Sequence, residues 1–232
     1  MTATNWAGDV IPSTADKAGF KTATGAVVAT AVQTFMQMTL GGPSGNGILT
    51  VQPGAVLNCT DTWMMGQSSD EGGVLAMSGG TITVGTLFYV GNAGIGTINM
   101  SGGSISVGGL LSIADGAAAT SIGTVNLDGG IITAATFRMA YLGGTARLNI
   151  TGGKLIINGN VTGTIAGYIT NTWIKGYGSA SNVRYDYNVT TSGKTTVWAT
   201  ASFKATNPSP ANSVTDVARD VTLSWTGAAE AS

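Results

Sequence analysis

A short alternation, in which large apolar residues flank an asparagine, threonine or alanine, recurs along the chain, and a pair of glycines follows each clear copy. The clear copies are Leu75-Ala76-Met77, Ile98-Asn99-Met100, Val125-Asn126-Leu127 and Leu148-Asn149-Ile150, followed by Gly79-Gly80, Gly102-Gly103, Gly129-Gly130 and Gly152-Gly153. Leu49-Thr50-Val51, with Gly54 after it, is a degenerate fifth copy. From Gly54, the steps to the second glycine of each pair are 26, 23, 27 and 23 residues. A period of this length is typical of a solenoid.

Each repeat predicts three short strands. In the first strand the apolar positions face inward and the polar position between them faces outward, because side chains alternate across a strand. The glycine pair then turns the chain, since glycine adopts positive φ without a Cβ clash. The inward residues of the second strand are Ile82, Ile105, Ile132 and Leu155. The third strand contains the triplets Trp63-Met64-Met65, Phe88-Tyr89-Val90, Leu111-Ser112-Ile113 and Phe137-Arg138-Met139, whose middle residues face outward. With no helical periodicity, the pattern predicts an all-β parallel β-helix (a solenoid) of about five or six coils.

The repeat motif G-x-[LIV]-N-[MLI]-[STD]-G-G-x-[IL], within residues 20–170, resembles the right-handed parallel β-helices of pectin-lyase-like and autotransporter-passenger proteins. The resemblance implies a right-handed solenoid and says nothing about chemistry. Residues 1–44, with Trp6, Gly8 and Pro12, look like the N-terminal cap that precedes such repeats in large secreted bacterial proteins, together with a first coil. Residues 45–160 hold the repeats. Residues 161–200 lose the repeat and gain aromatic side chains, which indicates a C-terminal cap.

The last segment, residues 201–232, has a different composition. It opens with a linker-like stretch that contains Pro208 and Pro210, and continues to Val221-Thr222-Leu223-Ser224-Trp225. This pattern is similar to the first strands of bacterial immunoglobulin-like or fibronectin-type-III modules, although it is too short to form a sandwich. We therefore expect a truncated start of such a module, and covalently linked neighbouring domains in a longer protein.

Composition excludes several classes of function. The formal net charge is -1 and 9% of residues are charged, so no basic footprint for nucleic acid or an anionic membrane exists. No apolar run reaches the roughly 18 residues of a membrane span. The chain has no histidine, which removes the commonest general base and metal ligand. Its one cysteine, Cys59, lies among apolar residues and is expected to be an inert buried thiol. Low charge and Thr/Ser/Asn-rich surfaces favour a secreted or cell-surface monomer.

Two rows of varied residues form the candidate site. The outward positions of the third strands are Met64, Tyr89, Ser112 and Arg138, and the turn positions three residues later are Gln67, Asn92, Asp115 and Tyr141. We name these eight residues the variable strip. Aromatic rings pack on sugar rings, while amide and charged groups hydrogen-bond to hydroxyls. Such groups at one-coil intervals suit a polysaccharide, whose repeat length is comparable to the coil rise; freely varying turns are the alternative explanation.

The remaining charged residues argue against catalysis. The repeat-region cations Arg138, Arg147 and Lys154 fall on different strands and faces, so they do not converge on one substrate. Asp70 and Glu71 are neighbours in a turn and form no facing pair for glycoside hydrolysis. No cofactor or metal is expected, with a calcium site near Asp70, Glu71 and Asp115 as an open alternative.

We therefore expect a non-catalytic carbohydrate-binding module of a secreted multidomain protein. Its partner would be a polysaccharide such as xylan or another β-glycan, and in architecture the chain resembles known β-helical carbohydrate-binding modules. The first alternative is a structural or adhesive cell-surface stalk with no small ligand. The second is a polysaccharide lyase or glycoside hydrolase.

Overall fold

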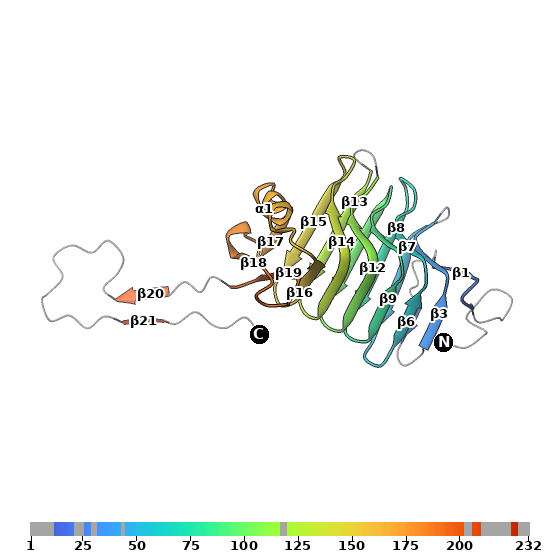
Figure 1. Cartoon of the computed structure of the whole chain (residues 1–232), viewed down its shortest axis with the longest axis horizontal. Coiled ribbons are helices and arrows are strands. Elements are labelled where there is room, and N and C mark those ends of the chain that lie inside the picture. The colour runs from blue at the N-terminus through green and yellow to red at the C-terminus, as the bar shows by residue number, and fades with distance from the viewer. Residues whose placement is uncertain are drawn as a thin grey trace, which may run out of the picture.

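The chain folds as a parallel β-solenoid of about six turns. The computed structural model describes residues 12–20, 26–28, 32–42, 45–116, 120–201, 206–209 and 224–226. Figure 1 shows the coils stacked side by side, with β3 toward the N-terminal end of the stack and α1 at the other end. The prediction of a mostly β chain that forms a parallel solenoid of five or six coils is confirmed.

Each coil contributes up to three strands, which we call strand one, strand two and strand three. Strand one forms a sheet of β2 (Ala26–Val28), β5 (Gly47–Val51), β8 (Gly72–Met77), β11 (Ile95–Met100), β13 (Ile122–Leu127), β15 (Thr145–Ile150) and β17 (Ile174–Gly176). Strand two comprises β3 (Val32–Phe35), β6 (Val56–Cys59), β9 (Thr81–Val84) and β16 (Lys154–Asn158). Strand three comprises β1 (Lys17–Phe20), β4 (Gln37–Leu40), β7 (Thr62–Met65) and β10 (Leu87–Val90). In two coils strands two and three merge into one long strand, β12 (Ser104–Ile113) and β14 (Ile131–Met139).

The core is built from the predicted inward columns. Strand one pairs in register from coil to coil, so Leu75, Ile98 and Val125 stack in one column. All ten predicted inward residues of strand one are buried, as are the four of strand two. An aromatic group fills the N-terminal half of the core, with ring centroids of Phe35 and Trp63 6.1 Å apart and those of Trp63 and Phe88 5.4 Å apart. Burial of these columns is the main favourable term that holds the coils together.

The glycine pairs serve two different purposes. The second glycine adopts a left-handed conformation in three of the four pairs, at Gly80, Gly103 and Gly130, with φ of +86° at Gly103; Gly153 in the fourth pair does not. The first glycine lies against the coil before it: a Cβ at Gly129 would lie 2.2 Å from the carbonyl oxygen of Ser101. The sequence predicts the turn, whereas the close stacking of successive turns is seen only in the folded structure.

The C-terminal end of the solenoid is covered by residues 161–200. An α-helix, α1 (Thr162–Thr170), was not expected from the sequence; its Ile165 is fully buried and its Tyr168 ring packs edge-on against Phe137, with centroids 6.0 Å apart. A 3-10 turn (Ala180–Asn182) leads to β18 (Val183–Tyr187), and β19 (Lys194–Ala199) lies antiparallel between β18 and β16. This reversal covers the open edge of β16, which would otherwise be free to pair with another chain.

The described parts of residues 1–44 already contain strands of the solenoid. β2 pairs with β5, β3 with β6 and β4 with β7, so they form a full coil, and β1 pairs with β4. The predicted cap residues Trp6 and Gly8 lie outside the described residues. In residues 201–232, β20 (Thr206–Ser209) and β21 (Ser224–Thr226) pair antiparallel. β20 contains Pro208 of the predicted linker-like stretch, so this part of the stretch is a paired strand, while Pro210 lies outside the described residues. The proposed domain boundaries stay predictions.

Candidate functional site

The outward half of the variable strip forms one continuous column. Met64, Tyr89, Ser112 and Arg138 are direct register partners on β7, β10, β12 and β14. Strand alternation places them outward because the residues before and after each of them belong to the core or pack against it. Adjacent members therefore lie about 4.8 Å apart along the stack.

The turn half of the strip follows the same strands. Gln67, Asn92, Asp115 and Tyr141 each lie two residues beyond the end of strand three. Backbone hydrogen bonds stack these turns on one another: Asn92 N–H donates to the carbonyl oxygen of Met65, and Asp115 N–H donates to that of Gly91. The stacking keeps the second row parallel to the first.

Three members of the strip are joined by hydrogen bonds and an ion pair. Asp115 Oδ1 accepts from the Ser112 hydroxyl at 2.6 Å and from Arg138 Nε at 2.7 Å, and Arg138 Nη2 forms an ion pair with the same carboxylate. Arg138 Nε also donates to Ser112 Oγ at 3.2 Å. The strip's two charges therefore neutralise each other.

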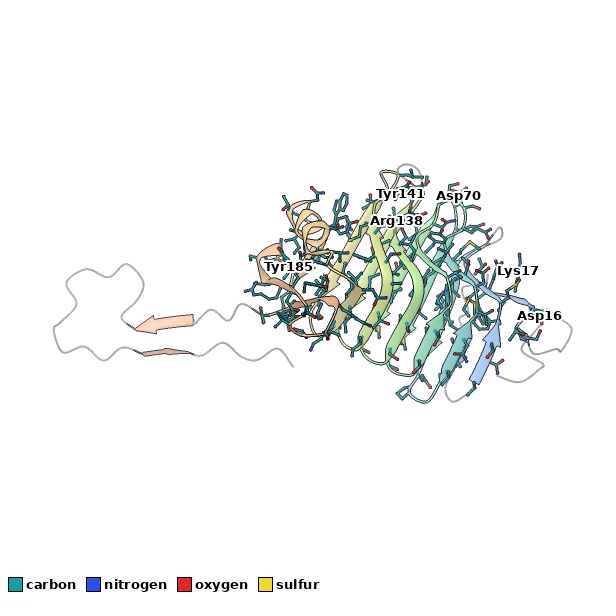
Figure 2. The ribbon with its side chains drawn as sticks, viewed as in Figure 1. Asp16, Lys17, Asp70, Arg138, Tyr141 and Tyr185 are labelled. Atoms are coloured by element: carbon teal, nitrogen blue, oxygen red, sulfur yellow. The ribbon has the colours of Figure 1, made fainter. Side chains whose placement is uncertain are left out.

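The two tyrosines of the strip flank this charged cluster. The guanidinium carbon of Arg138 lies 4.0 Å from the ring centroid of Tyr141, a cation–π contact, and Tyr141 is 60% exposed. Figure 2 shows Arg138 and Tyr141 together at the upper edge of the solenoid, away from Tyr185 on the C-terminal cap. Burial raises the pKa of Tyr89 above its ordinary value of 10, and the nearby Asp115 carboxylate adds to the increase.

The other polar groups of the strip are free. In the described part of the chain, no side-chain hydrogen bond is formed by the hydroxyl of Tyr89 or by the amides of Gln67 and Asn92. Gln67 is exposed, and Tyr89 and Asn92 are partly exposed. These donors and acceptors are available to a molecule that lies along the strip.

The exposure of individual strip residues departs from the prediction at one position. Ser112 points outward by register, yet its exposed fraction is 0%. Its short side chain lies between the long side chains of Tyr89 and Arg138 and is bonded to Arg138, so it supports the surface instead of forming it. Sequence alternation gives the direction of a side chain but not what covers it.

Two further residues extend the site beyond the eight that the sequence indicated. Thr39 on β4 is the register partner of Met64 and continues the column by one coil. The triplet Met38-Thr39-Leu40 has the same apolar–polar–apolar pattern as the later strand-three triplets, and this signal was available in the sequence. Leu142, which follows Tyr141, is also exposed.

The other candidate chemistries find less support. Arg147 and Lys154 are exposed on β15 and β16, which belong to different sheets from each other. Asp115 is paired with Arg138, Glu71 Oε2 accepts from the backbone of Ser68, and no group of three acidic, cysteine or histidine side chains in the described ranges could hold a metal ion. Cys59 is buried, as predicted, and burial raises its pKa to about 11.

The aromatic residues of the C-terminal cap divide into two groups. Trp173 packs against Tyr168, with ring centroids 5.6 Å apart, and is partly buried, as expected of a cap. Tyr177, Tyr185 and Tyr187 are exposed instead of buried. They lie on the cap and not on the variable strip.

No helix in the described ranges is long and apolar enough to cross a bilayer; α1 has nine residues. Comparison of the chain with protein-family models, with curated proteins and with solved structures finds no match.

Proposed function

We propose that the chain is a non-catalytic carbohydrate-binding module that binds a neutral polysaccharide, such as xylan or another β-glycan, along the variable strip. The observation that carries the proposal is the row of unbonded, solvent-accessible polar groups beside an exposed aromatic ring. Tyr89, Asn92 and Gln67 offer free hydrogen-bonding groups on two adjacent coils, and Tyr141 offers a ring two coils further on.

The spacing of these groups suits an extended polymer. Tyr89 lies on β10 and Arg138 lies on β14, the strand that leads into the turn of Tyr141. These two strands are two steps apart in the sheet, or roughly 10 Å along the stack. A linear glycan that lies across the coils would contact about one turn with each sugar unit, because the sugar repeat and the coil rise are of comparable length. Stacking on the ring and hydrogen bonds to hydroxyls would then repeat along its length.

Catalysis is not part of the proposal. A lyase needs a basic residue to accept a proton and a cation to neutralise a uronate. Arg138 is held by Asp115, and Arg147 and Lys154 lie on other strands, so these three cations of the repeat region do not converge.

The wider setting follows from composition and from resemblance. Low charge and the likeness to β-helices of secreted bacterial multidomain proteins favour a secreted or cell-surface location. The pattern Val221-Thr222-Leu223-Ser224-Trp225, the end of which lies in β21, favours the start of an immunoglobulin-like module, which would link the solenoid to further domains. The monomer is expected to bind its polysaccharide alone, without nucleic acid or membrane.

Affinity electrophoresis against a panel of polysaccharides tests the proposal. Wild type should be retarded by at least one neutral polysaccharide, and Tyr89→Ala and Arg138→Ala should migrate faster in that gel. Arg147→Ala and Tyr185→Ala remove the same residue types from other surfaces and should be retarded like wild type. No retardation by any polysaccharide would overturn the proposal, and release of reducing ends or unsaturated uronates would indicate an enzyme.

A stalk without a ligand is the second candidate. It is favoured by the internal bonding of Ser112, Asp115 and Arg138, because groups that satisfy one another stabilise a scaffold without binding anything. The electrophoresis separates the two functions: a stalk would give no retardation in any gel.

A further inference from the structure

The charged pair of the variable strip is partly buried. The side chain of Asp115 is 14% exposed and that of Arg138 is 29% exposed. Three contacts hold the guanidinium: Nε donates to Asp115 at 2.7 Å and to Ser112 at 3.2 Å, and Nη2 pairs with the carboxylate. Charge-assisted bonds of this kind fix the plane of a guanidinium group.

Tyr141 rests on this fixed group. The ring centroid lies 4.0 Å from the guanidinium carbon, so one side of the ring faces Arg138, while the residue as a whole stays 60% exposed. A side chain at the tip of a turn would otherwise sample several rotamers and lose that freedom on binding a ligand. The contact with Arg138 reduces this loss by holding the ring in place before a ligand arrives.

The same pairing sets the charge of the surface. Arg138 carries the strip's positive charge and Asp115 cancels it at hydrogen-bonding distance. A uronate carboxylate placed here would either compete with Asp115 for Arg138 or lie beside a second carboxylate. In neither arrangement does the uronate find a cation that lacks a partner. A neutral sugar can contact the ring and the free amides without competing for Arg138 or approaching the Asp115 carboxylate.

We propose that Asp115 and Arg138 are positioning residues that hold Tyr141 as a stacking platform for a sugar ring, and that their mutual neutralisation selects neutral polysaccharides over uronate-bearing ones. This inference rests on the proposed function, because it assigns roles within the same binding surface.

Calorimetric titration with two xylans tests the inference: one unsubstituted, and one with the same backbone carrying glucuronate side groups. Tyr141→Ala should weaken binding of the unsubstituted xylan about tenfold, as the loss of a good stacking contact would. Tyr141→Phe keeps the ring and should bind like wild type. If Tyr141→Phe binds the unsubstituted xylan as weakly as Tyr141→Ala does, the ring is not the stacking platform.

The Asp115→Asn variant should change the preference between the two xylans, which would not be expected if Asp115 served only to stabilise the fold. The variant frees Arg138, so the ratio of affinities should shift toward the glucuronate-bearing xylan by about threefold, while the unsubstituted xylan binds more weakly. Its thermal midpoint, measured alongside, checks that the fold is intact.

The outcomes separate the two proposals. If wild type binds neither xylan nor any other neutral polysaccharide, the proposed function fails and the inference fails with it. If wild type binds and Tyr89→Ala abolishes binding, but Tyr141→Ala and Asp115→Asn change neither affinity nor preference, the binding function stands and the inference is overturned.

Discussion

Alanine occupies a left-handed turn position in two coils where three earlier coils have glycine. The residue directly after strand three is Gly41, Gly66 or Gly91, with φ of +76°, +61° and +77°. In the next two coils it is Ala114 or Ala140, with φ of +58° and +50°. Left-handed backbone is costly for any residue with a Cβ, so these alanines are strained relative to the glycines.

Replacing Ala140 with glycine should therefore stabilise the solenoid. Relief of the strain outweighs the extra flexibility of glycine in the unfolded chain, and Ala140→Gly is expected to raise the free energy of unfolding by about 0.5–1 kcal/mol. Equilibrium unfolding in urea measures the change. Ala134→Gly, within β14 and without positive φ, is the control and should lower stability. If Ala140→Gly lowers the free energy of unfolding as Ala134→Gly does, the left-handed backbone at Ala140 is not strained.

Cys59 should not react in the folded protein. Its exposed fraction is 1%, and burial raises its pKa to about 11, so almost no thiolate exists at about pH 8. An aromatic disulfide reagent is expected to label Cys59 only after denaturant is added, as followed by absorbance. Rapid stoichiometric labelling of the native chain would contradict this burial.

At the scale of elements, a row of asparagines joins three coils on the outside of the strand-one sheet. Asn126 Nδ2 donates to Asn99 Oδ1, and Asn149 Nδ2 donates to Asn126 Oδ1, both at 2.8 Å. The central residue takes part in both bonds. The row forms because one register places the three side chains on adjacent strands.

Removal of the Asn126 side-chain amide should break both hydrogen bonds of the asparagine row. Asn126→Ala is expected to lower the free energy of unfolding by about 1 kcal/mol, given the usual net value of partly exposed hydrogen bonds. Urea unfolding measures the loss. Thr124→Ala changes an outward neighbour on the same strand and should have a much smaller effect; equal losses would mean that the amide bonds contribute nothing.

Asp61 links the turns of successive coils. Its carboxylate accepts from Thr86 at 2.7 Å in the following coil and from Gln37 at 3.0 Å in the preceding one. These hydrogen bonds from Thr86 and Gln37 hold the pKa of Asp61 below its ordinary value of 3.8.

The sign of the resulting pH dependence follows from that direction. The folded pKa lies below the unfolded one, so the stabilisation is fully present above pH 3.8 and is lost as pH falls through the folded pKa. Asp61→Asn should therefore have a lower free energy of unfolding in urea than wild type at about pH 6. This difference in stability should shrink toward about pH 2. A difference that stays constant across this range would show that the carboxylate charge is not responsible.

The elements differ in how far the sequence predicts them. Inward columns such as Leu75, Ile98 and Val125 follow from alternation with a fixed period, because every coil repeats the same physical requirement. α1 does not repeat, and its sequence of glycines and β-branched residues has little helix propensity. It depends on tertiary contacts of Ile165 and Tyr168 that no local pattern encodes.

The candidate site was predicted as a row but not as a network. Aligning the coils places Arg138 beside Ser112 and Asp115 in the neighbouring turn, and the register confirms that placement. The bonds among the three depend on side-chain rotamers and lengths, which spacing does not determine. The burial of Ser112 and the contact of Arg138 with Tyr141 follow from those bonds.

At the scale of the whole molecule, the solenoid holds the variable strip as a straight and rigid row. Parallel strands in register fix the distance between turns, and the antiparallel β19 covers the C-terminal edge of β16. The end of the strip is also anchored, since the backbone N–H of Met139, next to Arg138, donates to the Tyr168 hydroxyl at 3.3 Å. A rigid row of this kind loses little freedom when it binds an extended partner.

Amide hydrogen exchange, with and without the polysaccharide that most retards the chain in electrophoresis, tests the central claim most directly. If the variable strip is the binding surface, exchange should slow in the turns at 66–68, 91–93, 114–116 and 140–142. Exchange should stay unchanged in the strand-one sheet at 97–99 and in the cap at 185–187. Slowing confined to those other surfaces, or none at saturating polysaccharide, would contradict the account.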